Sequence, residues 1–169
     1  MNLTILGNII AFIASVIMIL VSYVKSKKNI IKLQTIQMSL FVISNLVLGG
    51  ITGAIINTAN VIRNILCYKE KLTTKMIIIL NITIIILSIL FNNLSIIGLL
   101  PVIASVIYTC FMNTKSVINL KLLIIMTTIA WAIYDMTIKS YTSLIFDVFS
   151  LITCIFSIFQ IKFKVTKKV

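Results

Sequence analysis

The sequence predicts an all-α protein that crosses a membrane seven times. Three observations support this prediction: 60% of the 169 residues are hydrophobic, only 11% are charged, and long apolar runs alternate with short lysine clusters. A soluble domain needs about 25% charged residues to cover its surface, so most of the surface of this chain is expected to face lipid. In hydrocarbon each backbone polar group must be satisfied within its own segment, so the isoleucine-rich runs are expected to be helices.

Seven apolar segments are long enough to cross the hydrocarbon core, which takes about 20 residues, or fewer inside a bundle. Turns are expected at 49–50, 92–93 and 139–140, where Gly-Gly, Asn-Asn and Lys-Ser pairs stand. Little polarity marks the boundary between the second and third segments, around residues 49–53. The predicted helices cover residues 4–24, 30–49, 51–68, 75–91, 95–113, 117–138 and 141–162.

The basic residues predict the orientation of these helices. The first apolar segment has no basic residue before it and no small-residue cleavage site, so we expect a membrane anchor with its N-terminus outside. With seven spans, all basic residues except Lys139 and Arg63 then lie in or beside cytoplasmic segments, whereas six or eight spans break the alternation. The residues on the cytoplasmic side are Lys25, Lys27, Lys28, Lys32, Lys69, Lys71, Lys75, Lys115, Lys121, Lys162, Lys164, Lys167 and Lys168.

The composition excludes several classes of function. The net charge of +12 lies in clusters between apolar runs, without a basic groove or interleaved aromatics, so we expect anionic membrane lipid and not nucleic acid as the partner. The chain has no histidine, and Cys67, Cys110 and Cys154 are dispersed, which predicts neither a metal site nor a disulfide framework. With three acidic residues and no phosphate-binding glycine loop, we expect no catalytic residues, no cofactor and no enzyme activity.

An internal repeat organises the chain. The run Ile-Ala-Ser-Val-Ile at 13–17 recurs at 103–107, and the same offset of 90 places Asn57 opposite Asp147. Polar residues that coincide inside apolar helices are more informative than isoleucines that match. Because a unit of three helices ends on the opposite side of the membrane, a parallel copy needs one additional helix between the units.

The repeat therefore predicts a 3-1-3 arrangement of two parallel triple-helix bundles about an axis along the membrane normal. The first bundle is expected at residues 1–72, a linker helix at 73–93 and the second bundle at 94–162, with a basic cytoplasmic tail at 163–169. A chain that holds both bundles is complete as a monomer, and a homo-oligomer remains an alternative.

Short motifs resemble known membrane proteins. Residues 98–105 (Gly-Leu-Leu-Pro-Val-Ile-Ala-Ser), Lys115-Ser116 and 131–135 (Trp-Ala-Ile-Tyr-Asp) resemble the first and second helices of the triple-helix bundles in SWEET and semiSWEET proteins, relatives of the PQ-loop proteins. Together with 60–63 (Asn-Val-Ile-Arg), the Leu-Leu-Pro-Val-Ile and Trp-x-Ile motifs make nearly the whole chain resemble the YgjV family of bacterial inner-membrane proteins. The second resemblance implies a multi-pass protein of the bacterial plasma (inner) membrane.

The SWEET resemblance implies facilitated or proton-linked transport of a small polar, sugar-like solute through a site between the repeats. The sequence departs from that pattern at Ala11 and Phe41, which lie opposite Pro101 and Trp131, and at Asp147, which is acidic where a sugar site would more usually offer asparagine. The alternative is a non-transporting accessory or receptor-type membrane protein, because a fold does not fix a function.

Polar residues inside the predicted helices are the candidate binding site. Asp147 is costly to insert into a membrane and is expected to face the bundle interior, as a solute ligand, a proton carrier, a counter-ion or a structural hydrogen-bond acceptor. Asn57 is expected to face it across the pseudo-two-fold axis. Asn60 and Arg63 share a face of the third helix, where Arg63 pairs with Asp147, binds an anionic group or extends to the headgroups.

Three further residues complete the candidates. Trp131, with Phe41 at the equivalent position of the first repeat, is interpreted as a stacking wall for a solute or as an anchor at the membrane surface. Asp135, one turn beyond Trp131, is either part of the outer mouth or solvated. Pro101 is expected inside the fifth helix, where it permits a gating hinge or a static kink.

Overall fold

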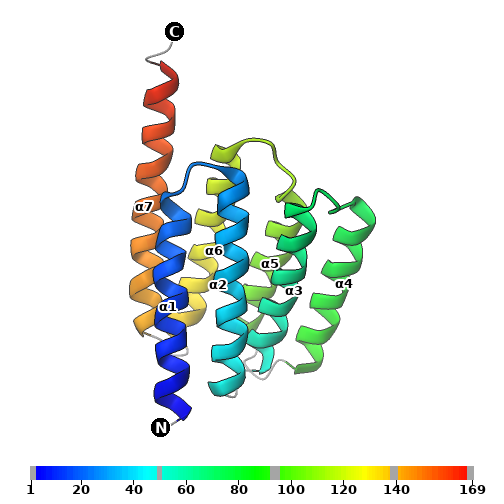
Figure 1. The fold of residues 1–169 in the computed structure, drawn as a ribbon. Helices are drawn as coiled ribbons and strands as arrows, with labels where there is room; N and C mark the ends of the chain where they lie inside the picture. The colour runs from blue at the N-terminus through cyan, green and yellow to red at the C-terminus, as the bar shows by residue number, and fades with distance from the viewer. Residues whose placement is uncertain (1–2, 49–50, 92–95, 138–140, 167–169) are drawn as a thin grey trace.

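The computed structural model describes residues 3–48, 51–91, 96–137 and 141–166, and the regular structure of these residues is entirely helical (Figure 1). Seven α-helices and one short 3-10 helix follow one another along the chain. They are α1 (Leu3–Tyr23), α2 (Lys27–Leu48), α3 (Ile51–Tyr68), α4 (Thr74–Phe91), η1 (Ile97–Leu99), α5 (Leu100–Phe111), α6 (Val117–Thr137) and α7 (Tyr141–Thr166).

The prediction of seven helices is confirmed, with differences at the ends. The turns expected at 49–50, 92–93 and 139–140 lie outside the described residues. Helix α7 continues to Thr166, so the first residues of the predicted basic tail are helical. The helix predicted from residue 95 is shorter: the 3-10 turn η1 comes first and α5 begins at Leu100.

This later start changes the interpretation of Pro101. Pro101 stands in the first turn of α5, not in the interior of a helix. The backbone N–H groups of a first turn have no partner within the helix, so proline there removes no helical hydrogen bond and its fixed φ suits the helix start. The prediction of a proline inside the helix is therefore wrong, and Pro101 marks the junction between η1 and α5.

Five of the described helices are long and apolar enough to cross a membrane, and α3 and α5 are not among them. Helix α5 has 12 residues, a length of about 18 Å. Helix α3 has 18 residues but carries several polar side chains, which lower its hydropathy. The five spans are Ile5–Tyr23, Lys27–Leu48, Thr74–Phe91, Val117–Tyr134 and Ser143–Ile161.

Six helices form a ring and α4 lies outside it. Helix α1 packs against α2 and α7, α2 against α3, and α6 against both α5 and α7, while α3 and α5 contact each other and close the ring. Helix α4 packs on α3 and α5 (Figure 1). We call the end of the bundle that holds the connections at 24–26, 69–73 and 112–116 the C-terminal face, which is uppermost in Figure 1, and the opposite end the N-terminal face.

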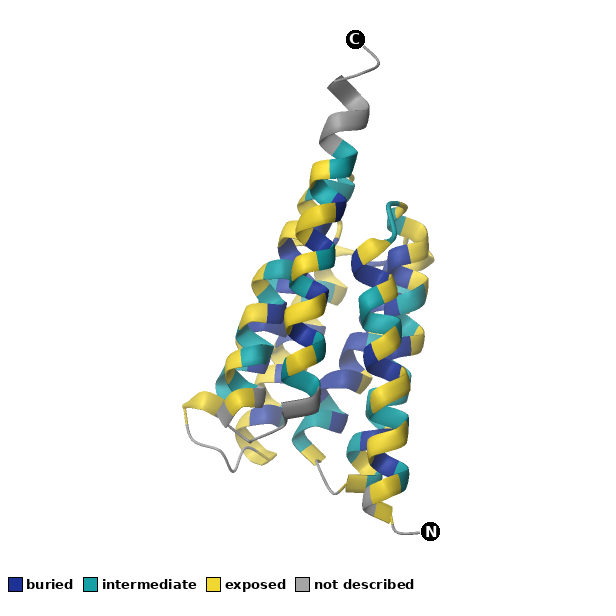
Figure 2. Ribbon diagram, turned by 90° about the vertical axis from the view of Figure 1, so that its left-hand side faces the viewer, coloured by how far each residue is buried: buried dark blue, intermediate teal, exposed yellow. Residues whose placement is uncertain are grey.

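The bundle is apolar outside and partly polar inside. Large hydrophobic side chains such as Phe12, Ile82 and Phe156 are exposed, and buried positions lie on the helix faces that meet each other (Figure 2). An exposed apolar surface of this extent is stable only in lipid. The buried polar residues are Ser15, Ser22, Gln34, Gln37, Ser44, Asn57, Asn60, Arg63, Asn64, Asn81, Ser88, Ser105, Thr109, Lys121, Thr128, Asp147, Ser150 and Ser157.

Candidate functional site

Helix α3 supplies the polar centre of the bundle. Asn57, Asn60, Arg63 and Asn64 follow one another at spacings of three and four residues or stand side by side, so they share a broad face of the helix. All four side chains are buried, and the Arg63 side chain is only 2% exposed. Arg63 therefore does not extend to the lipid headgroups, which removes that interpretation of its charge.

The Arg63 guanidinium is held by amide and hydroxyl oxygens. Its Nε and Nη2 donate hydrogen bonds to Oδ1 of Asn64 at 3.1 and 2.9 Å, and its Nη1 donates to Oδ1 of Asn60 at 2.8 Å. A longer contact of 3.4 Å joins Nη1 to the Thr109 hydroxyl on α5. The guanidinium carbon lies 4.5 Å from the centre of the Tyr108 ring, within the range of a cation–π interaction.

Helix α5 completes this cluster from the other side of the contact between α3 and α5. The Ser105 hydroxyl donates to the same Asn60 oxygen at 2.6 Å, and the Thr109 hydroxyl donates to the Ser105 carbonyl at 2.7 Å. The Tyr108 hydroxyl donates to Oε1 of Gln34 on α2 at 2.8 Å, which extends the cluster to a third helix. We call these seven residues the Arg63 network: Gln34, Asn60, Arg63, Asn64, Ser105, Tyr108 and Thr109.

The Arg63 network explains how the bundle retains a buried cation. An arginine at the centre of a membrane helix costs about 2.5–3.5 kcal/mol on insertion scales. Four hydrogen bonds and one aromatic face offset this cost, because a hydrogen bond to a charged group has a net contribution of about 1.5–3 kcal/mol. The arrangement leaves the guanidinium with its full positive charge, since none of these partners is anionic.

A second buried cation, Lys121, lies beside α1 and α7. Its side chain is 0% exposed and its Nζ donates to the Ser22 carbonyl at 2.6 Å. That carbonyl belongs to the last turn of α1, where carbonyls have no helical partner and the helix dipole favours a cation. Lys121, which we placed at the cytoplasmic side from the sequence, therefore caps a helix inside the bundle.

The contact between α1 and α7 is polar as well. The Ser22 and Ser150 hydroxyls form a hydrogen bond, and the Ser157 hydroxyl donates to the Tyr23 carbonyl at 3.3 Å. Lys25 donates to Gln160 nearer the C-terminal face. Serines at 150 and 157 are two turns apart on α7, so they face α1 together.

The structure brings only some of the predicted site residues together. Asn60 and Arg63 are hydrogen-bonded to each other. Asn57 and Asp147, the latter 4% exposed, are both buried, on α3 and α7. Each lies six residues into its helix, and Asn57 precedes Arg63 on α3 by about 9 Å of helical rise.

The predicted aromatic residues lie elsewhere. Trp131 packs against the apolar cluster of Ile56, Ala59, Ile84 and Val102, and meets the Tyr134 ring edge-on at 5.8 Å. It therefore belongs, partly buried, to the interface of α6 with α3, α4 and α5. Phe41 is half-buried on α2, and the side chain of Asp135 lies outside the described residues.

Sequence reasoning missed most of the Arg63 network. Asn64 could have been found, because it stands four residues after Asn60 on the same helical face. Ser105 stands in the repeated run at 103–107, which gives no sign of a hydrogen bond to another helix, and Tyr108 and Thr109 follow it at spacings of three and four residues. No sequence signal links Gln34 of α2 to α5, because that contact depends on how the helices pack.

The Tyr108 hydroxyl provides a test of the network's contribution to stability. Tyr108→Phe keeps the aromatic face under Arg63 but leaves the buried Gln34 oxygen without this donor. We expect the free energy of unfolding to fall by about 1–3 kcal/mol. Unfolding of the purified protein in detergent measures this, with Tyr23→Phe as the control because Tyr23 is exposed. Equal stability of the two variants would contradict the assignment.

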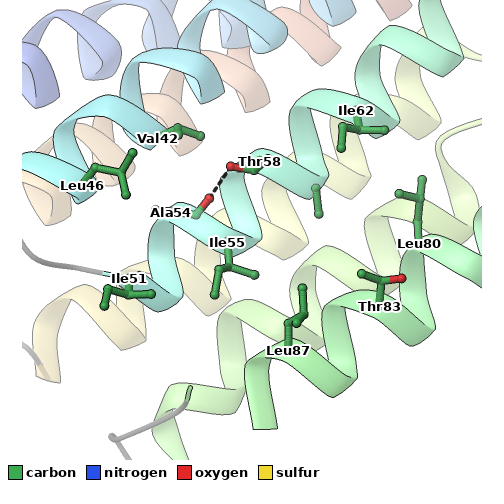
Figure 3. Close-up of a pocket in the computed structure, with 11 residues that line it drawn as sticks. Val42, Leu46, Ile51, Ala54, Ile55, Thr58, Ile62, Leu80, Thr83 and Leu87 are labelled. Carbon is green, nitrogen blue, oxygen red and sulfur yellow. Dashed lines mark hydrogen bonds between the residues drawn. The ribbon is translucent and has the colours of Figure 1, made fainter. Parts of the chain in front are cut away.

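A lipid-facing groove lies apart from this network, between α2, α3 and α4. Its volume is about 300 Å³, and its walls are almost entirely apolar (Figure 3). The Thr58 hydroxyl at its edge donates to the Ala54 carbonyl within α3 at 2.8 Å, so it presents no free donor. The groove is lined by Val42, Leu46, Ile51, Ala54, Ile55, Thr58, Ala59, Ile62, Leu80, Thr83 and Leu87.

Among the described residues, no three His, Cys, Asp or Glu side chains gather as a metal site would require. An apolar exterior, five helices of membrane-spanning length and a hydrogen-bonded polar interior define a multi-pass membrane protein. Residues 5–164 match the model of the Imp-YgjV family, described as bacterial inner membrane protein, and the chain belongs to this family. No curated protein and no solved structure matches the chain.

Proposed function

We propose that this inner-membrane protein is a carrier for a small polar solute, which passes between two three-helix units. The observation that carries the proposal is the Arg63 network, because Asn60 and Arg63 of α3 meet Ser105 and Thr109 of α5 where the two units touch. Polar side chains inside a membrane bundle are costly and typically line solute paths. The metal-free, cofactor-free and non-enzymatic character expected from the sequence is part of this proposal.

The ring of helices supports the proposed 3-1-3 repeat. The repeat relates the first unit to the second by pairing α1 with α5, α2 with α6 and α3 with α7. When the two units are exchanged in this way, the contact between α1 and α7 becomes the contact between α5 and α3, and both contacts are present. The ring is thus consistent with a two-fold axis along its centre, with α4 as the linker outside it. This is the symmetry of parallel repeats in SWEET-type carriers, in which two units rock about a shared site. The proposal includes an outer N-terminus and a cytoplasmic C-terminal face, which carries the lysine clusters.

Uptake into proteoliposomes tests the carrier proposal. The panel contains labelled sugars, polyols, amino acids and small carboxylates, with and without a pH gradient. For a transported solute, Asn60→Leu is expected to reduce uptake about tenfold or more, because it removes the acceptor shared by Arg63 and Ser105 while keeping the number of side-chain heavy atoms. Asn29→Leu, at an exposed position of α2, is the matched control. A folded protein that moves none of these solutes would contradict the proposal.

A non-transporting accessory role is the second candidate. The groove between α2, α3 and α4 favours it, because this recess could receive a helix of another membrane protein. A stoichiometric partner that copurifies with the chain, together with the absence of solute flux, would support this role. Thr58→Leu fills the edge of the groove and is expected to weaken such a complex while Asn60→Leu leaves it intact.

A further inference from the structure

We infer that the Arg63 network is a binding site for a small anion with a carboxylate or phosphate group. This inference deepens the proposed function, on which its role in transport rests, by naming the class of solute. The first reason is the charge of the network. Every hydrogen bond of the Arg63 guanidinium with a described residue goes to a neutral oxygen.

Neither of the two described acidic side chains, Glu70 and Asp147, supplies the missing counter-charge. Glu70 is exposed in the connection between α3 and α4. Asp147 lies on α7, which is not a neighbour of α3 in the ring, and none of the hydrogen bonds of the Arg63 guanidinium goes to it. The backbone of Asp135 lies two residues before the end of α6, at the N-terminal face. Among the described side chains, the cation at Arg63 is thus balanced only by dipoles.

Lys121, the other buried cation among the described residues, has a different electrostatic environment from that of Arg63. Its ammonium group caps the carbonyl end of α1, which carries a partial negative charge. Arg63 has no such helix end among its partners, since they are all side chains. Of these two buried cations, Arg63 is therefore the one whose charge a bound anion would neutralise.

Asn64 provides the second, independent observation. The guanidinium has only donors, so the Asn64 amide must turn its oxygen toward Arg63 and its NH₂ group away. Asn64 is 0% exposed, and its Nδ2 has no hydrogen-bond partner among the described residues. A buried donor without an acceptor is rare in proteins, and a ligand that accepts from it after the amide rotates would account for it.

The hydrogen-bond geometry indicates how an anion would bind. Nε and Nη2 form the edge of arginine that binds both oxygens of a carboxylate or phosphate, and in this structure one Asn64 oxygen accepts from both. The Asn64 oxygen stands where one oxygen of the anion would lie. An anion that replaces it accepts from Arg63 and, once the Asn64 side chain rotates, from the Asn64 NH₂ group. Because the network is buried, the anion reaches it when the contact between α3 and α5 opens.

Asn64→Asp is the sharpest test, because it supplies a carboxylate from within the chain at constant size. We expect this variant to keep or increase thermal stability through an internal ion pair with Arg63, and to lose anion binding. Acetate and inorganic phosphate are the probes, and binding is measured by saturable thermal stabilisation of the purified protein and by equilibrium binding of the labelled anions. Asn119→Asp makes the same change at an exposed position of α6 and is the matched control.

Wild type and Asn119→Asp are expected to bind at least one of the two anions saturably, and Asn64→Asp to bind it about thirtyfold or more weakly. Arg63→Gln is expected to show the same loss, which keeps the test decisive if Asn64→Asp does not fold. Equal anion binding in all folded proteins, or no saturable binding of either anion to wild type, would overturn the inference.

The outcome separates this inference from the carrier proposal, because binding is measured without flux. If the protein takes up a neutral solute, and Asn64→Asp takes it up at the same rate, the carrier proposal is supported and the inference that its solute is an anion is overturned. Saturable anion binding by a protein that moves no solute would confirm the site and contradict the carrier.

Discussion

Asp147→Ala is expected to reduce solute uptake about tenfold to a hundredfold, whereas Asp147→Asn retains at least about half of it. Asp147 is almost completely buried in the N-terminal half of α7, six residues into its helix, as Asn57 is on α3. Inserting a carboxylate into a membrane costs free energy, so a carboxylate at this position is expected to line the path of the solute. Asparagine keeps the size of the side chain and one carbonyl acceptor, while alanine removes both.

Initial uptake rates in proteoliposomes with and without a pH gradient measure this effect. Wild-type protein and Asp147→Glu are assayed beside the two variants, at equal reconstituted amounts. Full uptake by Asp147→Ala would show that Asp147 lies outside the path. Loss of uptake in both variants, with pH-dependent uptake by the wild type, would instead show that the charge itself is needed, as in proton coupling.

Locking α1 to α7 is expected to stop transport reversibly. The Ser22 and Ser150 hydroxyls are hydrogen-bonded across the contact between these helices, so cysteines at both positions place two thiols side by side. In a rocking carrier this contact must open toward the C-terminal face once in each cycle. Oxidation of Ser22→Cys/Ser150→Cys is expected to lower uptake about tenfold or more, and reduction to restore it.

The experiment requires a background in which Cys67, Cys110 and Cys154 are alanine, because all three native cysteines are free thiols. Each single cysteine variant, treated with the same oxidant, controls for damage by the reagent. Disulfide formation is followed by the gel mobility of the full-length chain. Full uptake by the fully oxidised double variant would contradict a rocking motion at this contact.

The sequence predicted the helices well because the requirement for a helix in lipid is local. Each apolar run must satisfy its own backbone, so the bounds of α3, predicted at 51–68, agree with Ile51–Tyr68 in the structure. The pairing of Asn60 with Arg63 was predictable for the same reason, since a spacing of three residues on one helix fixes their proximity.

Contacts between helices were harder to predict from the sequence. The partners of Arg63 on α5 and α2 depend on which faces meet in the ring, and many alternative packings leave the same apolar exterior. The start of α5 was misplaced because an apolar run continues through η1, and only the packed structure separates the 3-10 turn from the α-helix. Trp131 was read as facing a solute or the membrane surface, but its environment is an apolar cluster formed by three other helices.

Residue order alone thus determined the class of protein, the seven helices and the position of polar residues along them, because these follow from the balance of apolar and polar groups within each segment. The tertiary structure decided that Arg63 turns inward onto Tyr108, that Lys121 caps α1, and that Asn64 is left with an unmatched donor. These features arise where separate helices exclude lipid together, so the free energy that selects them belongs to the packed bundle and not to any one segment.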